Sequence, residues 1–156
     1  MQDDGLSALV EAVLTASRVL VGVAAESLSA LDEDVTLVQY RALVVCVSRG
    51  PLTLAALADA LQVNPSTASR LCDRFVERGL LERRPDDADR RQIRLTATAR
   101  CRELVEAVSA HRRVVLARIL GRVPPGQRAH LIDALQAFND AAGEAPAQAW
   151  AQASIL

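Results

Sequence analysis

Short hydroxyls and arginines share one face of a helix that the sequence predicts from Asn64 to Arg78. At helical spacing, the apolar residues of this segment fall on the opposite face, as Ala68, Leu71, Cys72, Phe75 and Val76. The polar face consists of Ser66, Thr67, Ser69, Arg70 and Arg74. Small hydroxyls at a helix N-terminus, followed by arginines, suit a helix that enters the major groove of duplex DNA, where arginine binds guanine or phosphate. An amphipathic helix with a merely solvated polar face would show the same period, so this helix alone does not decide.

A second group of charges lies in DDADRRQIRLT, residues 86–96. Arg90 and Arg91 are adjacent near its centre, and the residues that follow alternate between polar and apolar, as in a half-buried strand. Leu80–Arg84 and Gln92–Thr96 are therefore predicted to be the strands of a β-hairpin with a polar tip. A hairpin needs no pair of arginines at its tip in order to fold, because exposed ion pairs contribute little stability. The pair therefore favours a binding role.

Helix signals place both groups of side chains in one unit. Thr53 caps a short helix, LAALADAL, and Asn64 and Pro65 open the next helix as its N-cap and its first residue. Only Gln62 and Val63 join these two helices, which is the spacing of a helix-turn-helix.

Longer helices are predicted on both sides of this unit. Their expected ranges are 6–31, 36–50, 97–120 and 127–142. The first is about 26 residues or roughly 39 Å long, and it is apolar on more than one face, so it needs more than one partner surface. Thr36 and Gln39 form a capping box at the start of the second helix, and Thr96 is expected to cap the third. The tail GEAPAQAWAQASIL is only weakly patterned.

The bulk composition fits a single, mainly helical domain. The chain has 156 residues, of which 51% are hydrophobic and 3% aromatic. The net charge is −1, yet residues 64–94 hold eight arginines against six acidic residues, and the rest holds ten against thirteen. A basic segment on an acidic body is a weak indication of nucleic-acid binding. Because the sequence has no uncharged apolar run of 18 residues and no secretory signal, we expect a cytoplasmic protein without a membrane partner.

The sequence carries no legible catalytic or metal-binding motif. It has isolated histidines and widely spaced cysteines, namely His111, His130, Cys46, Cys72 and Cys101. We therefore expect no enzyme activity, no metal and no cofactor. The cysteines are expected to be buried apolar residues in a reducing compartment. The alternative is a thiol redox sensor, for which Cys101 is the best candidate because Arg100 and Arg102 could lower its pKa.

Residues 36–100 resemble the core of the MarR family of bacterial transcriptional regulators. The most specific matches are NPSTASRLCDRFVERGLLERR and the hairpin DDADRRQIRLT. The resemblance implies a mainly α, winged helix-turn-helix fold in which the hairpin is the wing. Within a single domain, 1–156, residues 35–97 would form the DNA-binding core, and residues 1–34 and 98–156 would form dimerisation helices.

The resemblance also implies a mode of action. A homodimer would present two recognition helices to a pseudo-palindromic site in double-stranded DNA, as a repressor that a small aromatic or phenolic effector releases. Arg90, with Arg91 beside it, would lie in the minor groove, and Asp87 or Asp89 would orient an arginine by a charge-assisted hydrogen bond. The arginines expected near phosphates are those of the strands, Arg83, Arg84 and Arg94. Polar groups that could line the effector cleft are Arg18, Arg41 and His111, although a place on the surface or on the dimer face is favoured for each.

Two further readings stay open beside this one. The first is redox control through a cysteine. The second is a winged-helix module that binds protein instead of DNA. It is disfavoured by the positions of Ser66, Thr67, Arg70 and Arg90.

Overall fold

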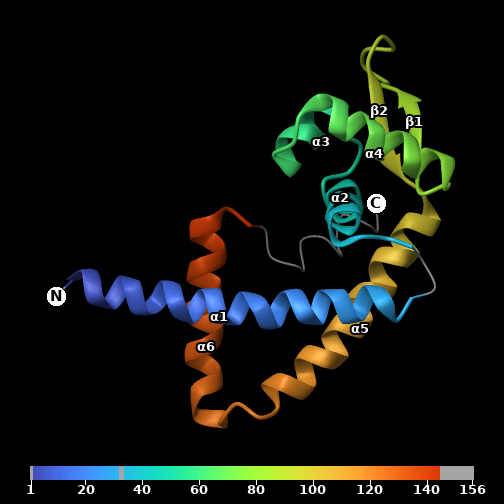
Figure 1. The fold of residues 1–156 in the computed structure, drawn as a ribbon. Coiled ribbons are helices and arrows are strands. Elements are labelled where there is room, and N and C mark those ends of the chain that lie inside the picture. Colours follow the sequence, from blue (N-terminus) through green and yellow to red (C-terminus); the bar gives the residue numbers. More distant parts are fainter. Residues whose placement is uncertain (1, 32–33, 145–156) are drawn as a thin grey trace.

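The computed structural model describes residues 2–31 and 34–144, and within them the chain forms six helices and one two-stranded hairpin (Figure 1). The tail that follows, 145–156, lies outside the described residues. In chain order the elements are α1 (Gln2–Ser29), α2 (Leu37–Ser48), α3 (Leu54–Leu61), α4 (Pro65–Glu77), β1 (Leu81–Pro85), β2 (Ile93–Ala97), α5 (Ala99–Leu120) and α6 (Pro125–Ala142). The predicted mainly α, winged helix-turn-helix fold is confirmed.

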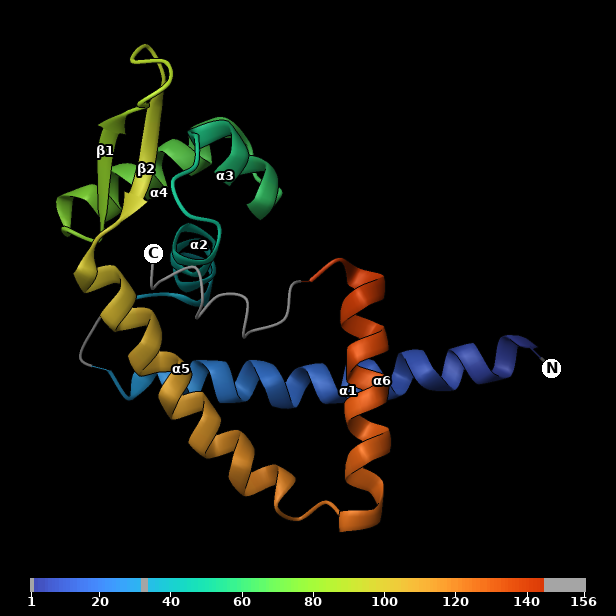
Figure 2. The ribbon, with the colours of Figure 1, turned by 180° about the vertical axis from the view of Figure 1, so that it is seen from behind.

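One end of the molecule is the compact unit that the sequence predicted. Helices α2, α3 and α4 and the hairpin pack around one core, and the hairpin tip points away from α1 and α6 (Figures 1 and 2). The largest fully buried side chains of this core include Phe75, Leu43, Leu57 and Leu80. A short backbone bridge between Leu52 and Leu95 ties the segment before α3 to β2, with N···O distances of 2.8 and 3.2 Å. The core and this bridge fix the hairpin relative to the helices.

The predicted capping residues begin their helices as expected. The hydroxyl of Thr36 accepts a hydrogen bond from the Gln39 N–H, and the Gln39 side chain accepts one from the Thr36 N–H, which completes the capping box of α2. Thr53 caps α3 in the same way through the N–H of Ala56. Gly79, at a φ of 68°, ends α4 in the left-handed region that glycine adopts without strain.

The hairpin differs from its prediction by one residue on each strand, and the cap that follows it was predicted wrongly. Thr96 does not cap α5, because it pairs with Glu82 in the antiparallel ladder, which continues to the buried Ala97. The cap is Thr98, whose hydroxyl oxygen accepts a hydrogen bond from the Cys101 N–H at 3.2 Å. The last helix also begins two residues early, since Pro125 takes the first helical position, where its missing N–H costs nothing.

Much of α1 and α6 is apolar and exposed to solvent in the single chain. Leu6 on α1 is 61% exposed and Phe138 on α6 is 53% exposed, and no residue of α6 is buried. Only the last third of α1, around Val23 and Leu28, contributes to the buried interior. By length and composition alone, Asp4–Ser29 could also cross a membrane, although the segment is not free of charged residues. Signal sequences and the buried core helices of water-soluble proteins have the same length and composition.

Candidate nucleic-acid interface

The N-terminus of α4 is held by the side chain of Asn64. Its Oδ1 accepts hydrogen bonds from the Thr67 N–H at 2.8 Å and from the Ser66 hydroxyl at 2.7 Å. The cap satisfies one of the free N–H groups of the first turn, and Pro65 at the first helical position has none. These local interactions fix where α4 begins, and therefore which of its side chains face outward.

The two faces of α4 are divided as the sequence predicted. Ala68, Cys72 and Phe75 are fully buried. On the opposite side, Ser66, Arg70 and Arg74 are exposed, and Thr67 and Ser69 are half-buried at the edges of that face. The predicted DNA-binding residues of this helix therefore lie together on one outward surface.

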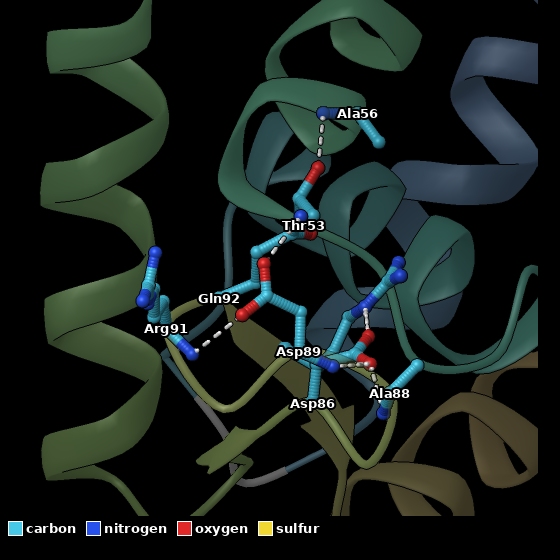
Figure 3. Close-up of polar contacts among 8 residues, drawn as sticks. Thr53, Ala56, Asp86, Ala88, Asp89, Arg91 and Gln92 are labelled. Carbon is cyan, nitrogen blue, oxygen red and sulfur yellow. Dashed lines mark hydrogen bonds and ion pairs between the residues drawn. The ribbon is translucent and has the colours of Figure 1, made fainter.

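Two aspartates order the tip of the wing, the hairpin loop between β1 and β2 (Figure 3). One carboxylate oxygen of Asp86 accepts the N–H groups of Ala88 and Asp89, at 2.7 and 3.2 Å, and the other accepts Nε of Arg94. The carboxylate of Asp89 accepts the N–H of Arg91 at 3.1 Å. The hydrogen bond from Arg94, followed by those from the two backbone N–H groups, lowers the pKa of Asp86 below its ordinary value.

The wing aspartate that holds an arginine side chain is not one of the two expected. Asp86, rather than Asp87 or Asp89, binds a guanidinium, and that guanidinium belongs to Arg94 in β2. Asp89 acts on the backbone of Arg91 instead of its side chain, because the tight loop turns the peptide N–H groups toward the carboxylate. Among the described residues, no hydrogen bond or ion pair involves the Asp87 side chain. The ordering of the tip therefore rests on Asp86 and Asp89.

The arginines of this end fall into two groups. The strand arginines are paired, Arg84 with Glu82 at 2.6 Å and Arg94 with Asp86. Arg84 and Arg94 lie directly opposite each other in the ladder, where two unpaired like charges would repel, so each pair removes a local conflict. In contrast, the structure describes no carboxylate within ion-pair distance of four exposed arginines, which are Arg70, Arg74, Arg90 and Arg91.

One ion pair of this surface was not foreseen. Nη2 of Arg83 in β1 lies 2.5 Å from Oδ1 of Asp73 in α4, so it joins the predicted recognition helix to the wing. The two residues are ten positions apart and belong to different elements. No periodicity in the sequence reports such a contact, because only the packing of the hairpin against α4 brings the two side chains together.

A pocket of about 480 Å³ lies between α1, α2 and α5. Its wall is mainly aliphatic, with two guanidinium groups, Arg41 and Arg112, and two hydroxyls, Tyr40 and Ser109, that lie 3.4 Å apart. Of the three polar groups named as able to line an effector cleft, Arg41 lines this pocket. The other two, Arg18 and His111, are not among its lining residues, and the sequence did not single out Arg112.

The three cysteines are buried in the core, where thiols are poorly reactive. Burial raises the pKa of Cys46 to about 12 and those of Cys72 and Cys101 to about 11. For Cys101, the effect of burial exceeds the opposite effect of Arg102, so its pKa is not lowered as the redox alternative requires. A redox sensor needs an accessible thiolate, which none of the three supplies in this conformation.

Comparisons with known proteins agree with this geometry. The family model described as MarR family matches residues 33–92. The crystal structure of RV1404 from Mycobacterium tuberculosis is 41% identical, and the alignment covers 91% of this chain and 97% of that chain with a TM-score of 0.84. A MarR family protein from Bacillus stearothermophilus is 21% identical, and the alignment covers 92% of this chain and 99% of that chain with a TM-score of 0.82.

A third structure shares the fold at lower similarity. It is a structure of BpsR from Bordetella bronchiseptica, whose DNA binding is regulated by 6-hydroxynicotinic acid. The two sequences are 23% identical, and the alignment covers 83% of this chain and 91% of that chain with a TM-score of 0.60. A comparison with curated proteins finds no match. The family match in the winged core, together with the similarity to RV1404 over nearly the whole length, shows that the chain belongs to the MarR family of winged helix-turn-helix transcriptional regulators.

Proposed function

We propose that this protein is a cytoplasmic, non-enzymatic repressor that binds a pseudo-palindromic site in double-stranded DNA as a homodimer and is released by a small effector. The observation that carries the DNA-binding part is the set of unpaired arginines on α4 and at the wing tip. Arg70 and Arg74 project from the helix that would lie in the major groove. Arg90 and Arg91 project from the tip that would reach the neighbouring minor groove, whose narrow A·T-rich form attracts arginine.

The wing residues fill different roles within this proposal. Arg90 and Arg91 supply the charge, and Asp89 orders the loop that carries them through the N–H of Arg91. Arg84 and Arg94, each already neutralised by a carboxylate, contribute little to the attraction of phosphates. Asp87, whose side chain makes no hydrogen bond or ion pair in the described residues, is left without an assigned role.

The apolar faces of α1 and α6 support the homodimer. A large exposed apolar area on a protein marks an interaction site. Leu9, Leu14, Ile132, Leu135 and Phe138 all belong to this surface, and each is at least 48% exposed in the single chain. A second copy offers the same surface and can cover it by a two-fold symmetric contact. Two copies would also present two α4 helices, as a pseudo-palindromic site requires.

The pocket between α1, α2 and α5 supports an effector. Arg41 and Arg112 can bind a carboxylate, and the aliphatic wall can cover an apolar body, so a small aromatic or phenolic acid fits its chemistry. The pocket joins the helices of the proposed dimer surface to the DNA-binding unit. A ligand there would release DNA only if it bound the non-DNA conformation more tightly than the DNA-bound one.

The test is binding to duplex DNA selected by the protein itself from a random-sequence library. We expect the selection to converge on a pseudo-palindrome and the protein to bind it with strong salt dependence. A panel of aromatic carboxylic acids, with 6-hydroxynicotinic acid among them, would then be titrated into the complex, and Arg41→Gln should reduce the response to any acid that releases DNA. Failure of the selection to converge would refute sequence-specific binding. Release by no acid of the panel would leave the proposed effector class without support.

A further inference from the structure

The ion pair between Asp73 and Arg83 lies where the recognition helix meets the wing. Nη2 of Arg83 and Oδ1 of Asp73 are 2.5 Å apart, and the two side chains are 44% and 50% exposed. Exposed pairs of this kind contribute only about 0–1 kcal/mol to stability. A role in holding the fold is therefore small, and the position of the pair points to another one.

The ladder explains why Arg83 turns toward α4. Directly paired residues of two antiparallel strands project from the same side of the sheet, and Arg83 is paired with the buried Leu95. Arg83 thus lies on the inner side of the hairpin, the side that packs on the core. Arg84 and its partner Arg94 lie on the outer side.

Asp73 belongs to the outward face of α4. It follows Arg70 by three positions, so the two side chains are neighbours on the helix surface. An unpaired carboxylate at this place would repel the phosphates that Arg70 and Arg74 are proposed to approach. The guanidinium of Arg83 neutralises it and at the same time joins α4 to β1.

We propose that Asp73 and Arg83 form a latch that sets the position of the wing relative to the recognition helix, so that Arg83 is a positioning residue for DNA binding and not a phosphate ligand. The inference rests on the proposed function, since it assumes that α4 and the wing bind one duplex together. Only DNA that must meet both elements at a fixed spacing should be sensitive to the latch. Non-specific binding, which follows net charge, should not be.

A charge-matched variant separates these roles. Asp73→Asn with Arg83→Gln removes the ion pair without changing net charge, and Glu82→Gln with Arg84→Gln does the same to the pair that lies wholly within β1. Both are compared with the wild type on the library-selected duplex and on an unselected duplex of equal length. The exchanged variant, Asp73→Arg with Arg83→Asp, restores a pair of opposite polarity.

The latch predicts a selective loss. The Asp73/Arg83 double variant should bind the selected duplex about tenfold more weakly, because a dimer contains two latches of the size measured for exposed pairs. Its affinity for the unselected duplex and its salt slope should be unchanged, and its thermal midpoint should fall by no more than about 4 °C. The Glu82/Arg84 control should bind both duplexes normally, and the exchanged variant should recover most of the loss.

Three results would overturn the latch. The first is unchanged affinity of the Asp73/Arg83 variant for the selected duplex. The second is an equal loss on both duplexes with a salt slope shallower by about 1.8 per dimer, since this would identify Arg83 as a phosphate ligand. The third is no recovery in the exchanged variant. If the wild type itself bound neither duplex, the proposed function would fail, and that result is distinct from all three.

Discussion

Arg90 gives the most quantitative test of the electrostatics at the wing. On α4 and the wing tip, each protomer presents four exposed arginines without a carboxylate partner in the described residues, so a dimer would present about eight to DNA. If each neutralises one phosphate, log K should fall with log salt at a slope of about −7, since each released counterion contributes about 0.9. Arg90→Gln removes two of the eight and should bring the slope to about −5.4.

The change is large enough to measure by fluorescence anisotropy. Between 50 and 200 mM salt, the wild type should lose affinity about 20,000-fold and Arg90→Gln about 2,000-fold. The control is the Glu82/Arg84 double variant, in which the removed arginine was already neutralised at 2.6 Å, and its slope should match the wild type. A wild-type slope in Arg90→Gln, or an equal change in the control, would show that paired and unpaired arginines do not differ as we infer.

Other consequences of the structure can be tested separately. Phe138→Asp should convert a dimer to monomers in sedimentation experiments, because it places a charge on the exposed apolar face of α6. Gln136→Asp on the same helix is the control and should leave the dimer intact. If the Phe138→Asp variant is still a dimer, this face of α6 is not part of the interface. Asn64→Ala should lower the free energy of unfolding, measured in urea, by about 1 kcal/mol, because it removes the side-chain cap of α4. The control Ser66→Ala should lower it by less than about 0.5 kcal/mol. Equal losses in the two variants would contradict the assignment of Asn64 as the cap. A thiol reagent at pH 8 should label no cysteine of the folded protein, because burial raises their pKa values to about 11 or 12, and it should label all three in denaturant. Rapid labelling of the folded protein would instead support the alternative of redox control through a cysteine.

The sequence predicted those features that depend on local hydrogen bonds and on periodicity. Thr36 with Gln39, and Asn64 with Pro65, begin their helices as expected, because the capping partner of each lies within three residues. The division of α4 into a buried and an outward face followed from its 3.6-residue period in the same way.

The features that were missed depend on contacts between distant segments. Thr96 and Thr98 are both plausible caps by residue type, and only the pairing of β2 with β1 assigns Thr96 to the strand. The Asp73–Arg83 pair exists only because the hairpin packs on α4. The wing offered several aspartates, and the geometry of the loop, which the sequence pattern does not encode, selects Asp86 as the partner of Arg94.

In the proposed complex, two copies of this chain hold two α4 helices and two wings against one duplex. Hydroxyl-radical footprinting on the library-selected duplex, with the stoichiometry measured on the same complex, tests it directly. We expect two protein copies per duplex and a two-fold symmetric pattern of backbone protection, with two half-sites centred about 10 base pairs apart and a protected minor groove beside each. One copy per duplex, or a single asymmetric patch of protection, would contradict the claim.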